Sequence, residues 1–586
     1  MTQQDFSDAQ IDRARIDGGF GFACAAFVLG LGLLAVLDRI GLPDAMLRIG
    51  MFALIFSGLV VVALSLRTMR PVDFYAGGRR LPATYAGIAF ANVAFGLFLP
   101  FLSPSPPGIS VTSAAAGFGI GCLWALFATG PILRRSGAYS FADLIASRFP
   151  HILVRGPVVL LMACCAACVA LGGYEIALQN LTAATGLDRS TGAAILGGLL
   201  IVLVVPAGLS GVLWVAAAAA VVTVAALVLP LGLGLVSGLP LALPIFGDQT
   251  LWSKAVGDFA IVTGADTQAG FELPITIAIG LGLATLAPLF GGSIATRDEG
   301  TAWRSGLVGM VWLALIALLA AASIAASTLA LDAGVSGRTP AKLPSAIVTA
   351  SGRGEIAVCG VHASDAAVLT RACAARAGPA QPLRMQDLKA DGDYLLESLP
   401  ALRGSEPTLA RLAAAFMIVL GMSIAASGIQ SVITSLAHDI RHPRRRLLGP
   451  TTRRLALTRL LAISFIILGS LWLARHSVDA RGLFTIALML SAALVTPLLA
   501  LALMPRPTSA SALAALCVAA FVTARFLLFD AAIMPPGELA TDAIFAAFDG
   551  LAVGLFVSFL PRRKPTGPAA SATTPSPQTE PQPGSE

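Results

Sequence analysis

The sequence predicts an all-α membrane protein that crosses a bilayer about fourteen times. Of its 586 residues, 56% are hydrophobic and only 12% are charged, and the mean hydropathy is +0.83, outside the range of soluble domains. A helix needs roughly 20 apolar residues to cross a hydrocarbon core about 30 Å thick. Apolar runs of this length recur along the whole chain between short polar breaks.

Each apolar run is assigned to one helical pass, bounded by charged residues, glycine or proline. The predicted passes are 19–38, 47–66, 83–102, 109–132, 156–178, 190–206, 210–238, 273–295, 305–331, 409–436, 455–474, 482–504, 509–530 and 541–561.

Arginine and lysine gather in alternate loops, for example at Arg79 and Arg80 before the third pass and at Arg444, Arg445 and Arg446 after the tenth. Positively charged loops stay on the cytoplasmic side. We therefore expect a multi-pass protein of the cell (inner) membrane with both termini in the cytoplasm. Orientation also explains the net charge of +7, so no nucleic-acid partner is expected.

The passes and the polar segments divide the chain into six parts. The long polar loop is expected outside, where Cys359 and Cys373 are candidates for a disulfide, the alternative being two free thiols. The tail is rich in Pro, Ser, Thr and Gln and is expected to be disordered. The parts are the cytoplasmic N-terminus with two leading helices (1–66), the first repeat and the start of a second (67–331), the loop (332–408), the rest of the second repeat (409–505), two trailing helices (506–561) and the tail (562–586).

Four polar segments carry a resemblance to a known family. They read DFYAGGRRLP at 73–82, RRSGAYSFAD at 134–143, DEGTAWRS at 298–305 and SLAHDI at 435–440. This combination resembles the sodium/solute symporter family, closest to its acetate and monocarboxylate permease branch, over about residues 70–505.

The resemblance implies a LeuT-like inverted repeat of five plus five helices, formed by passes three to seven and eight to twelve. The predicted topology agrees, because the third and eighth passes cross in opposite directions. Each repeat should open with a discontinuous helix whose unwound backbone can hold ions. Glycine and proline in 83–102 and 273–295 suit such breaks; the alternative is that they serve close helix packing.

The resemblance also implies a sodium site between the first and eighth core helices. It would use the backbone carbonyls of Phe90 and Val93 and the hydroxyl of Ser423, with Ser427 nearby. Ile424 stands where the family has a second hydroxyl, and Asn92 where it has an acid. Because hard cations need several oxygen ligands and charge compensation, a solute carboxylate would complete this site. Na⁺ as coupling ion is the one cofactor expected.

Polar residues within the passes are the candidates for solute binding: Asn92, Thr285, Gln430 and Glu175. Ser423, Ser427, Ser431 and Ser435 form a polar stripe along pass ten, which is interpreted either as a cation path leading inward or as small-residue packing. Glu175 is an acid inside an apolar pass; the alternative is that it reaches the outer interface.

We expect a secondary transporter, in which solute and cation meet near Asn92, Thr285 and Ser423 and one helix bundle rocks about them. The solute would be a small organic molecule, with a monocarboxylate such as acetate as the candidate, although Leu289 after Pro288 and the alanines after Trp214 depart from the acetate branch. No Walker, nucleophile-elbow or zinc motif indicates an enzyme. The alternative is a non-transporting sensor or regulatory membrane protein that keeps the symporter fold.

Overall fold

The computed structural model describes residues 3–102, 109–236, 238, 243, 247–264, 272–377, 382–403, 407–440, 451–529 and 536–560. The Pro-rich end of the predicted break after pass three (103–107) and the tail (562–586) lie outside the described residues. Below, "cytoplasmic" and "outer" denote the two sides predicted from the arginine distribution.

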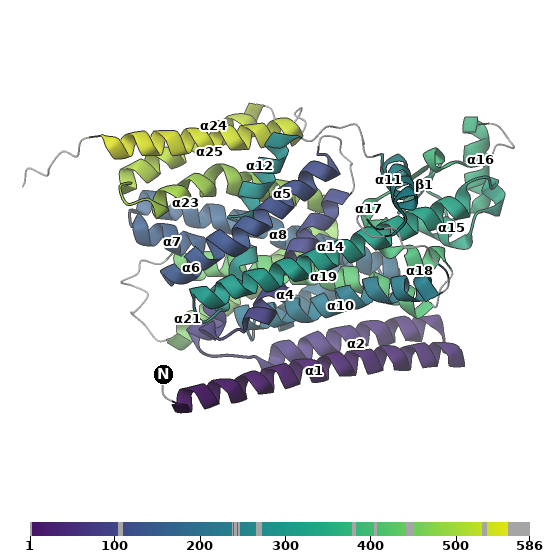
Figure 1. Cartoon of the computed structure of the whole chain (residues 1–586), viewed down its shortest axis with the longest axis horizontal. Helices are drawn as coiled ribbons and strands as arrows, with labels where there is room; N and C mark the ends of the chain where they lie inside the picture. The colour runs from purple at the N-terminus through teal and green to yellow at the C-terminus, as the bar shows by residue number, and fades with distance from the viewer. Residues whose placement is uncertain are drawn as a thin grey trace, which may run out of the picture.

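Long helices run side by side through the molecule (Figure 1), and each predicted pass falls on a helix or on consecutive helical segments. The leading pair is α1 (Gln3–Ile40) and α2 (Asp44–Ser65), and the trailing pair is α24 (Ser509–Phe529) and α25 (Pro536–Phe559). Within the described ranges, eleven helices are long and apolar enough to span a membrane, or twelve with one bent pair counted as a single span. The two remaining predicted passes are the shorter helix α9 and part of α24, so the count of fourteen stays a prediction.

The helices between these pairs follow the order predicted for two repeats. The first repeat contains α4 (Ala83–Phe98), α5 (Val111–Trp124), α6 (Gly130–Ser136), α7 (Phe141–Arg148), α8 (Ile152–Thr185), α9 (Arg189–Val204) and α10 (Leu209–Val236). The second contains α12 (Leu273–Leu283), α13 (Gly291–Ala295), α14 (Glu299–Val335), α19 (Pro407–Ile433), α21 (Thr451–Arg475), α22 (Ala480–Leu490) and α23 (Thr496–Leu503). Short helices α3 (Pro71–Ala76) and α11 (Gln249–Thr263) lie in connections.

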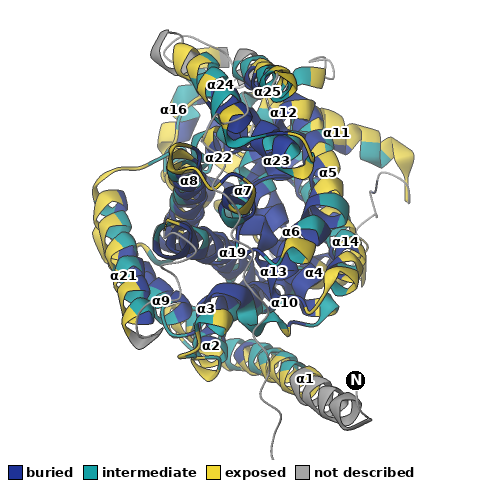
Figure 2. Ribbon diagram, turned by 90° about the vertical axis from the view of Figure 1, so that its left-hand side faces the viewer, coloured by how far each residue is buried: buried dark blue, intermediate teal, exposed yellow. Residues whose placement is uncertain are grey.

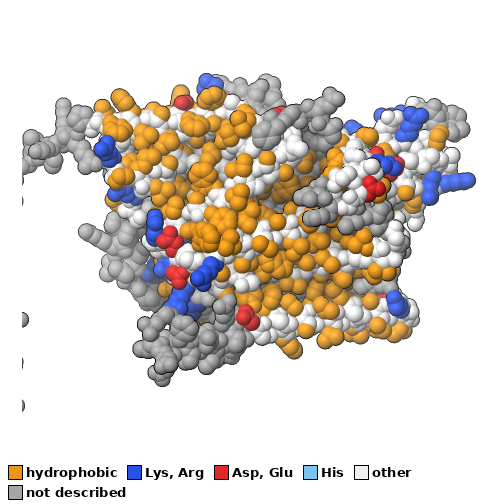
Figure 3. All heavy atoms as spheres, in the orientation of Figure 1, with side chains coloured by type: hydrophobic (Ala, Val, Ile, Leu, Met, Phe, Trp, Pro, Cys, Tyr) orange, Lys and Arg blue, Asp and Glu red, His pale blue; other side chains and the backbone are white. Residues whose placement is uncertain are grey.

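The centre of the bundle is formed by α4 and α19 (Figure 2). In the most apolar stretch of each span, 94% of the residues are buried in α19 and 89% in α4, compared with 11% in α1. Figure 3 shows apolar side chains across the middle of the face turned to the viewer, and Val311 of α14 is 68% exposed. A surface of this kind is suited to hydrocarbon rather than water.

Glycines bring α8 and α19 into direct backbone contact. A Cβ on Gly173 would lie 2.7 Å from the Ala425 nitrogen, and one on Gly428 would lie 2.6 Å from the Ala170 nitrogen. Apolar side chains gain little by leaving lipid for protein, so membrane helices associate by close packing of small residues. The glycines therefore fix the position of α19, which carries the predicted cation ligand Ser423.

The opening helix of the second repeat is discontinuous, as predicted. α12 ends at Leu283, and a 3-10 turn (Ala287–Phe290) leads into α13, with a bend of 52° between the two arms. Pro288 at the start of that turn cannot donate a backbone hydrogen bond, which favours the break. The opening helix of the first repeat differs from the expectation: α4 is α-helical to Phe98 and changes to a 3-10 turn only at Leu99–Leu102, so its middle is not unwound.

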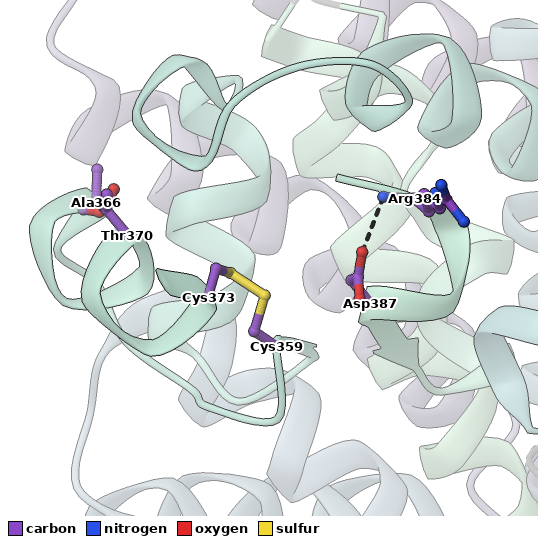
Figure 4. The surroundings of a disulfide bond; sticks show 6 residues. All are labelled: Cys359, Ala366, Thr370, Cys373, Arg384 and Asp387. Atoms are coloured by element: carbon purple, nitrogen blue, oxygen red, sulfur yellow. Dashed lines mark hydrogen bonds between the residues drawn. A yellow bond between two sulfur atoms is a disulfide. The ribbon is translucent and has the colours of Figure 1, made fainter. Parts of the chain in front are cut away.

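The long loop forms a small domain, which we call the loop domain (336–403). Its hydrophobic core also includes Val262 of α11 and Leu331 and Val335 of α14. Strand β1 (Ile356–Val358) pairs antiparallel with β2 (Leu388–Ala390), and helices α15 (Ser345–Gly352), α16 (Ala366–Ala377), α17 (Gly392–Glu397) and α18 (Leu399–Leu402) surround them. Cys359 and Cys373 form a disulfide (Figure 4), which ties α16 to the end of β1. The structure thus decides between the bridge and the free thiols.

The loop domain rests on the outer end of α4. A Cβ on Gly392, at the start of α17, would lie 2.5 Å from the Leu102 carbonyl oxygen. Such a close approach requires glycine at this position. The first core helix and the loop domain are therefore in contact without an intervening side chain.

The loop domain is expected to lose stability as pH rises. Burial, reinforced by the charge of Asp391, raises the pKa of Asp393 to about 6, and burial raises the pKa of Glu397 well above its usual range. The folded state therefore binds protons more tightly than the unfolded state. The stability gained from this is complete below about pH 4. For Asp393 it is lost as the pH rises through about 6, and for Glu397 it is lost at higher pH. Hydrogen exchange in α17, corrected for intrinsic rates, should show protection falling from about pH 5 to pH 7. Asp393→Asn should flatten this change; protection that rises with pH would contradict the assignment.

Candidate functional site

A hydrogen-bonded network of three side chains lies at the centre of the bundle, where α4, α10 and α19 meet. The Asn92 Nδ2 donates to the Ser423 Oγ at 3.0 Å, and the Thr223 Oγ1 donates to the Asn92 Oδ1 at 3.2 Å. All three residues are fully buried. A buried polar network of this kind holds its helices in one arrangement, and it brings together two of the residues predicted from the sequence, Asn92 and Ser423.

The predicted cation ligands around this network already take part in hydrogen bonds within the protein. Phe90 and Val93 lie within the continuous helix α4, so their carbonyls accept helical hydrogen bonds and keep one lone pair each. Ser423 Oγ also donates to the Leu420 carbonyl at 2.8 Å. Ile424 packs against α4 one helical turn from Asn92, because a Cβ on Gly96 would lie 2.5 Å from its Cδ1.

The serine stripe of α19 leads from the network to a small cavity. Ser427 Oγ donates to the Ser423 carbonyl at 2.9 Å, and Ser431 and Ser435 line a cavity of about 30 Å³, which has room for a water or two. The stripe from Ser423 to Ser431 is about 12 Å long at 1.5 Å rise per residue.

Gln430 is the strongest polar feature of this cavity. Its Nε2 donates to the Phe74 carbonyl at 3.0 Å, while its buried Oε1 has no hydrogen-bond partner among the described residues. Phe290 and Gly291 of the broken helix line the cavity from the opposite side. Leu209 of α10, in the first repeat, also lines the cavity. The cavity therefore lies between the two repeats and offers an unsatisfied amide oxygen to a cation, a water or a solute donor.

Two predicted solute-binding residues lie elsewhere. Thr285, at the break after α12, shares a hydrogen bond of 2.8 Å with the Ser491 Oγ. It therefore anchors the broken helix to the π-helical turn at Ser491–Val495, and its hydrogen bonds do not go to Asn92.

Glu175 is completely buried, ion-paired with Arg189 at the start of α9, and accepts from the Gln179 Nε2 at 2.8 Å. Both interpretations of Glu175 stay predictions, and in the structure Arg189 and Gln179 hold its carboxylate inside the protein. Arg189 Nε also donates to the Leu473 carbonyl at 2.6 Å, so the pair joins α8, α9 and α21.

Three of the four polar segments that carry the family resemblance (73–82, 134–143 and 435–440) meet Arg155 of α8 at the cytoplasmic end of α19. We call this group the inner cluster: Tyr75, Arg79, Tyr139, Ser140, Asp143, Arg155, His438 and Asp439. The Ser140 Oγ donates to the Asp439 Oδ2 at 2.5 Å, and the Arg155 Nε donates to the Asp439 carbonyl at 2.9 Å. Arg79 lies over the Tyr139 ring, with its guanidinium carbon 5.1 Å from the ring centroid. The inner cluster closes the cytoplasmic side of the cavity, since Tyr75, Tyr139 and Ser140 also line it.

Within the inner cluster, Asp143, His438 and Asp439 place three possible metal-ligand atoms within 4.8 Å of one another. The Asp439 carboxylate is already engaged, because its Oδ1 lies 3.0 Å from the His438 Nδ1 and its Oδ2 accepts from Ser140. These hydrogen bonds hold the Asp439 side chain within the inner cluster.

Two parts of the site were not predicted from the sequence. Thr223 is one threonine within an Ala/Val-rich helix. Its Oγ1 also lies 3.0 Å from the carbonyl oxygen of Ala219, one turn earlier in α10, as is common for threonine in a helix. The sequence therefore carries no signal for its contact with Asn92. The inner cluster joins segments about 300 residues apart. The charged and aromatic residues of these segments, next to the ends of membrane helices, were the sequence signal that could have predicted the cluster.

Comparisons with known proteins identify the fold. No family model and no curated protein matches the sequence. The structure of a Na⁺-coupled sialic acid symporter, in a substrate-bound outward-open state, aligns over 87% of this chain and 97% of that chain, with a TM-score of 0.62 and 13% sequence identity. A mutant of the Eremococcus coleocola manganese transporter aligns over 86% of this chain and 96% of that chain, with 14% sequence identity. Its TM-score is 0.40, which is too low to assign the fold. The chain therefore has the polytopic, LeuT-like fold of the first structure.

Proposed function

We propose that this chain is a secondary transporter that carries a small organic solute by alternating access, coupled to sodium bound between α4 and α19. The observation that carries the proposal is the buried Asn92–Ser423–Thr223 network, placed at the contact of helices from both repeats. It lies two helical turns from a cavity closed by the inner cluster. An ion that changes this network also changes how the repeats pack, which is what coupling requires.

The chemistry of the network favours a carboxylate solute. The side chains in it are an amide and two hydroxyls, which are neutral oxygen ligands. A cation bound there needs negative charge from elsewhere, and the solute can supply it. We therefore propose a monocarboxylate such as acetate or a larger relative, with cation and solute each raising the affinity for the other.

The test is uptake of labelled acetate and pyruvate into proteoliposomes, with sodium and proton gradients imposed separately. Uptake should rise with an inward sodium gradient, and the half-saturating sodium concentration should fall as solute increases. A neutral analogue of the same size, such as the corresponding amide, should not show sodium-dependent uptake. Uptake indifferent to every cation gradient would rule out the coupling.

One observation favours a second candidate, a sensor or regulatory protein that keeps the fold without transport. The Asn92 Nδ2 already donates to the Ser423 Oγ, so an N–H group stands where a cation would bind. Ser423→Ala separates the two functions: a transporter loses uptake, whereas a sensor shows no uptake before or after the change and alters only a downstream response.

A further inference from the structure

An apolar groove and a polar cavity adjoin one another between the leading helices and the core. The groove, about 320 Å³, is lined by Phe20 and Phe27 of α1, by Leu54 and Gly58 of α2 and by Val222 of α10. Figure 1 shows α1 and α2 lying along one side of the bundle. Phe22 is 77% exposed at the edge of the groove and Val61 66%, so the groove opens toward the hydrocarbon.

The polar cavity, about 260 Å³, lies where α2 ends and the DFYAGGRRLP segment begins. Arg67, Thr68, Asp73 and Arg80 line it. Among the described residues, neither the Arg67 nor the Arg80 side chain has a hydrogen-bond or ion-pair partner, and both side chains are exposed. Asp73 accepts from the Thr68 Oγ1 at 3.0 Å, so the cavity keeps a net positive charge.

Trp214 lines both the groove and the cavity and so marks where they meet. Its ring lies 4.5 Å from that of Tyr85, whose hydroxyl donates to the Asp17 Oδ1 at 2.7 Å. Tryptophan and tyrosine in such a pair are typical of the level where lipid headgroups meet acyl chains. The groove therefore lies at acyl-chain depth and the polar cavity at headgroup depth, on the predicted cytoplasmic side.

We propose that this combined site binds one anionic phospholipid from the cytoplasmic leaflet. An acyl chain fills the groove between α1, α2 and α10, and the phosphate is held by Arg67 and Arg80. Charge complementarity selects this occupant: two unpaired guanidiniums face a cavity with one hydrogen-bonded carboxylate, and arginine forks bind phosphate oxygens in pairs. A water-soluble anion leaves the groove unfilled, and an apolar helix leaves the arginines unpaired. The lipid joins the leading helices to the core.

The test uses the full chain and measures bound lipid by native mass spectrometry after adding phosphatidylglycerol or phosphatidylcholine. One phosphatidylglycerol should remain bound to the unchanged chain. The double substitution Arg67→Gln with Arg80→Gln should weaken binding roughly thirtyfold, since each arginine near an anionic lipid contributes on the order of fivefold. Arg70→Gln, which removes an exposed arginine from the same segment but outside the cavity, is the matched control.

A second pair of variants tests the groove. Gly58→Leu fills it, whereas Gly32→Leu adds the same side chain to an exposed position of α1; a Cβ at either glycine meets nothing within 4 Å. Gly58→Leu should lower lipid occupancy and Gly32→Leu should not, with unchanged melting curves in lipid-free detergent confirming that both fold. Equal binding of phosphatidylcholine, equal loss in Arg70→Gln, or a lipid-free dimer that covers the groove would each overturn the proposal.

Discussion

Gly421→Ala is expected to produce the largest loss of stability and of transport. A Cβ at this position would lie 2.7 Å from the Gly173 carbonyl oxygen and 2.7 Å from the Ala177 nitrogen. Both are backbone atoms, so α8 and α19 must move apart. Overpacking of this kind costs about 1–3 kcal/mol. The same displacement changes the position of Ser423, two residues along, relative to Asn92, so we expect uptake to fall roughly tenfold or more.

The measurement is the melting temperature of the full chain, followed by size-exclusion chromatography after heating, together with uptake into proteoliposomes. Gly198→Ala is the matched control. It makes the same substitution in α9, where a Cβ meets nothing within 4 Å, and alanine favours a helix over glycine by up to about 1 kcal/mol. If Gly421→Ala melts at the same temperature as Gly198→Ala, the direct helix contact does not stabilise the fold.

Asn92→Asp is expected to produce the largest gain in sodium affinity. The substitution places a carboxylate next to Ser423, at the position where the resembling family has an acid. Two unit charges 4 Å apart attract by about 4 kcal/mol at an effective dielectric constant of 20, and burial of the new carboxylate offsets part of this. We expect the half-saturating sodium concentration for uptake to fall by roughly 10- to 100-fold.

Asn180→Asp serves as the control for this experiment. It makes the same chemical change near the outer end of α8, where the Asn180 Nδ2 donates to its own Ile176 carbonyl and takes no part in the network. Sodium dependence unchanged in Asn92→Asp, or changed equally in Asn180→Asp, would show that the cation does not bind beside Asn92. The proposal that sodium binds between α4 and α19 would then fail. Solute transport coupled to another ion would remain testable in the same vesicles.

Most of the fold was predictable because the hydrocarbon core of a membrane restricts the backbone structures that can cross it. A segment that crosses hydrocarbon must satisfy its own backbone hydrogen bonds, so every long apolar run becomes a helix. The break between α12 and α13 followed from Pro288 and the glycines around it. The continuous centre of α4 did not follow, because Gly87 and Gly96 serve close packing there: a Cβ on Gly87 would lie 2.5 Å from the Ser305 carbonyl oxygen.

The site was predictable only in part, because its contacts join distant segments. Asn92 and Ser423 were recognised by resemblance, and the structure brings them into contact. Thr285 was placed with them because both repeats were expected to break at the same depth, yet only one helix breaks there. Glu175 was singled out without its partner, because Arg189 lies between the predicted passes 156–178 and 190–206.

The contact between Gly392 and Leu102 couples the loop domain to movements of the first core helix, α4. A movement of α4 that opens the outer side has to carry α17 with it or break this backbone contact. An antibody fragment that recognises the disulfide-linked face of the loop domain and one neighbouring loop would therefore trap a single conformation without reaching the solute path. The same face offers a place for a fluorescent label that reports opening and closing from outside the bilayer.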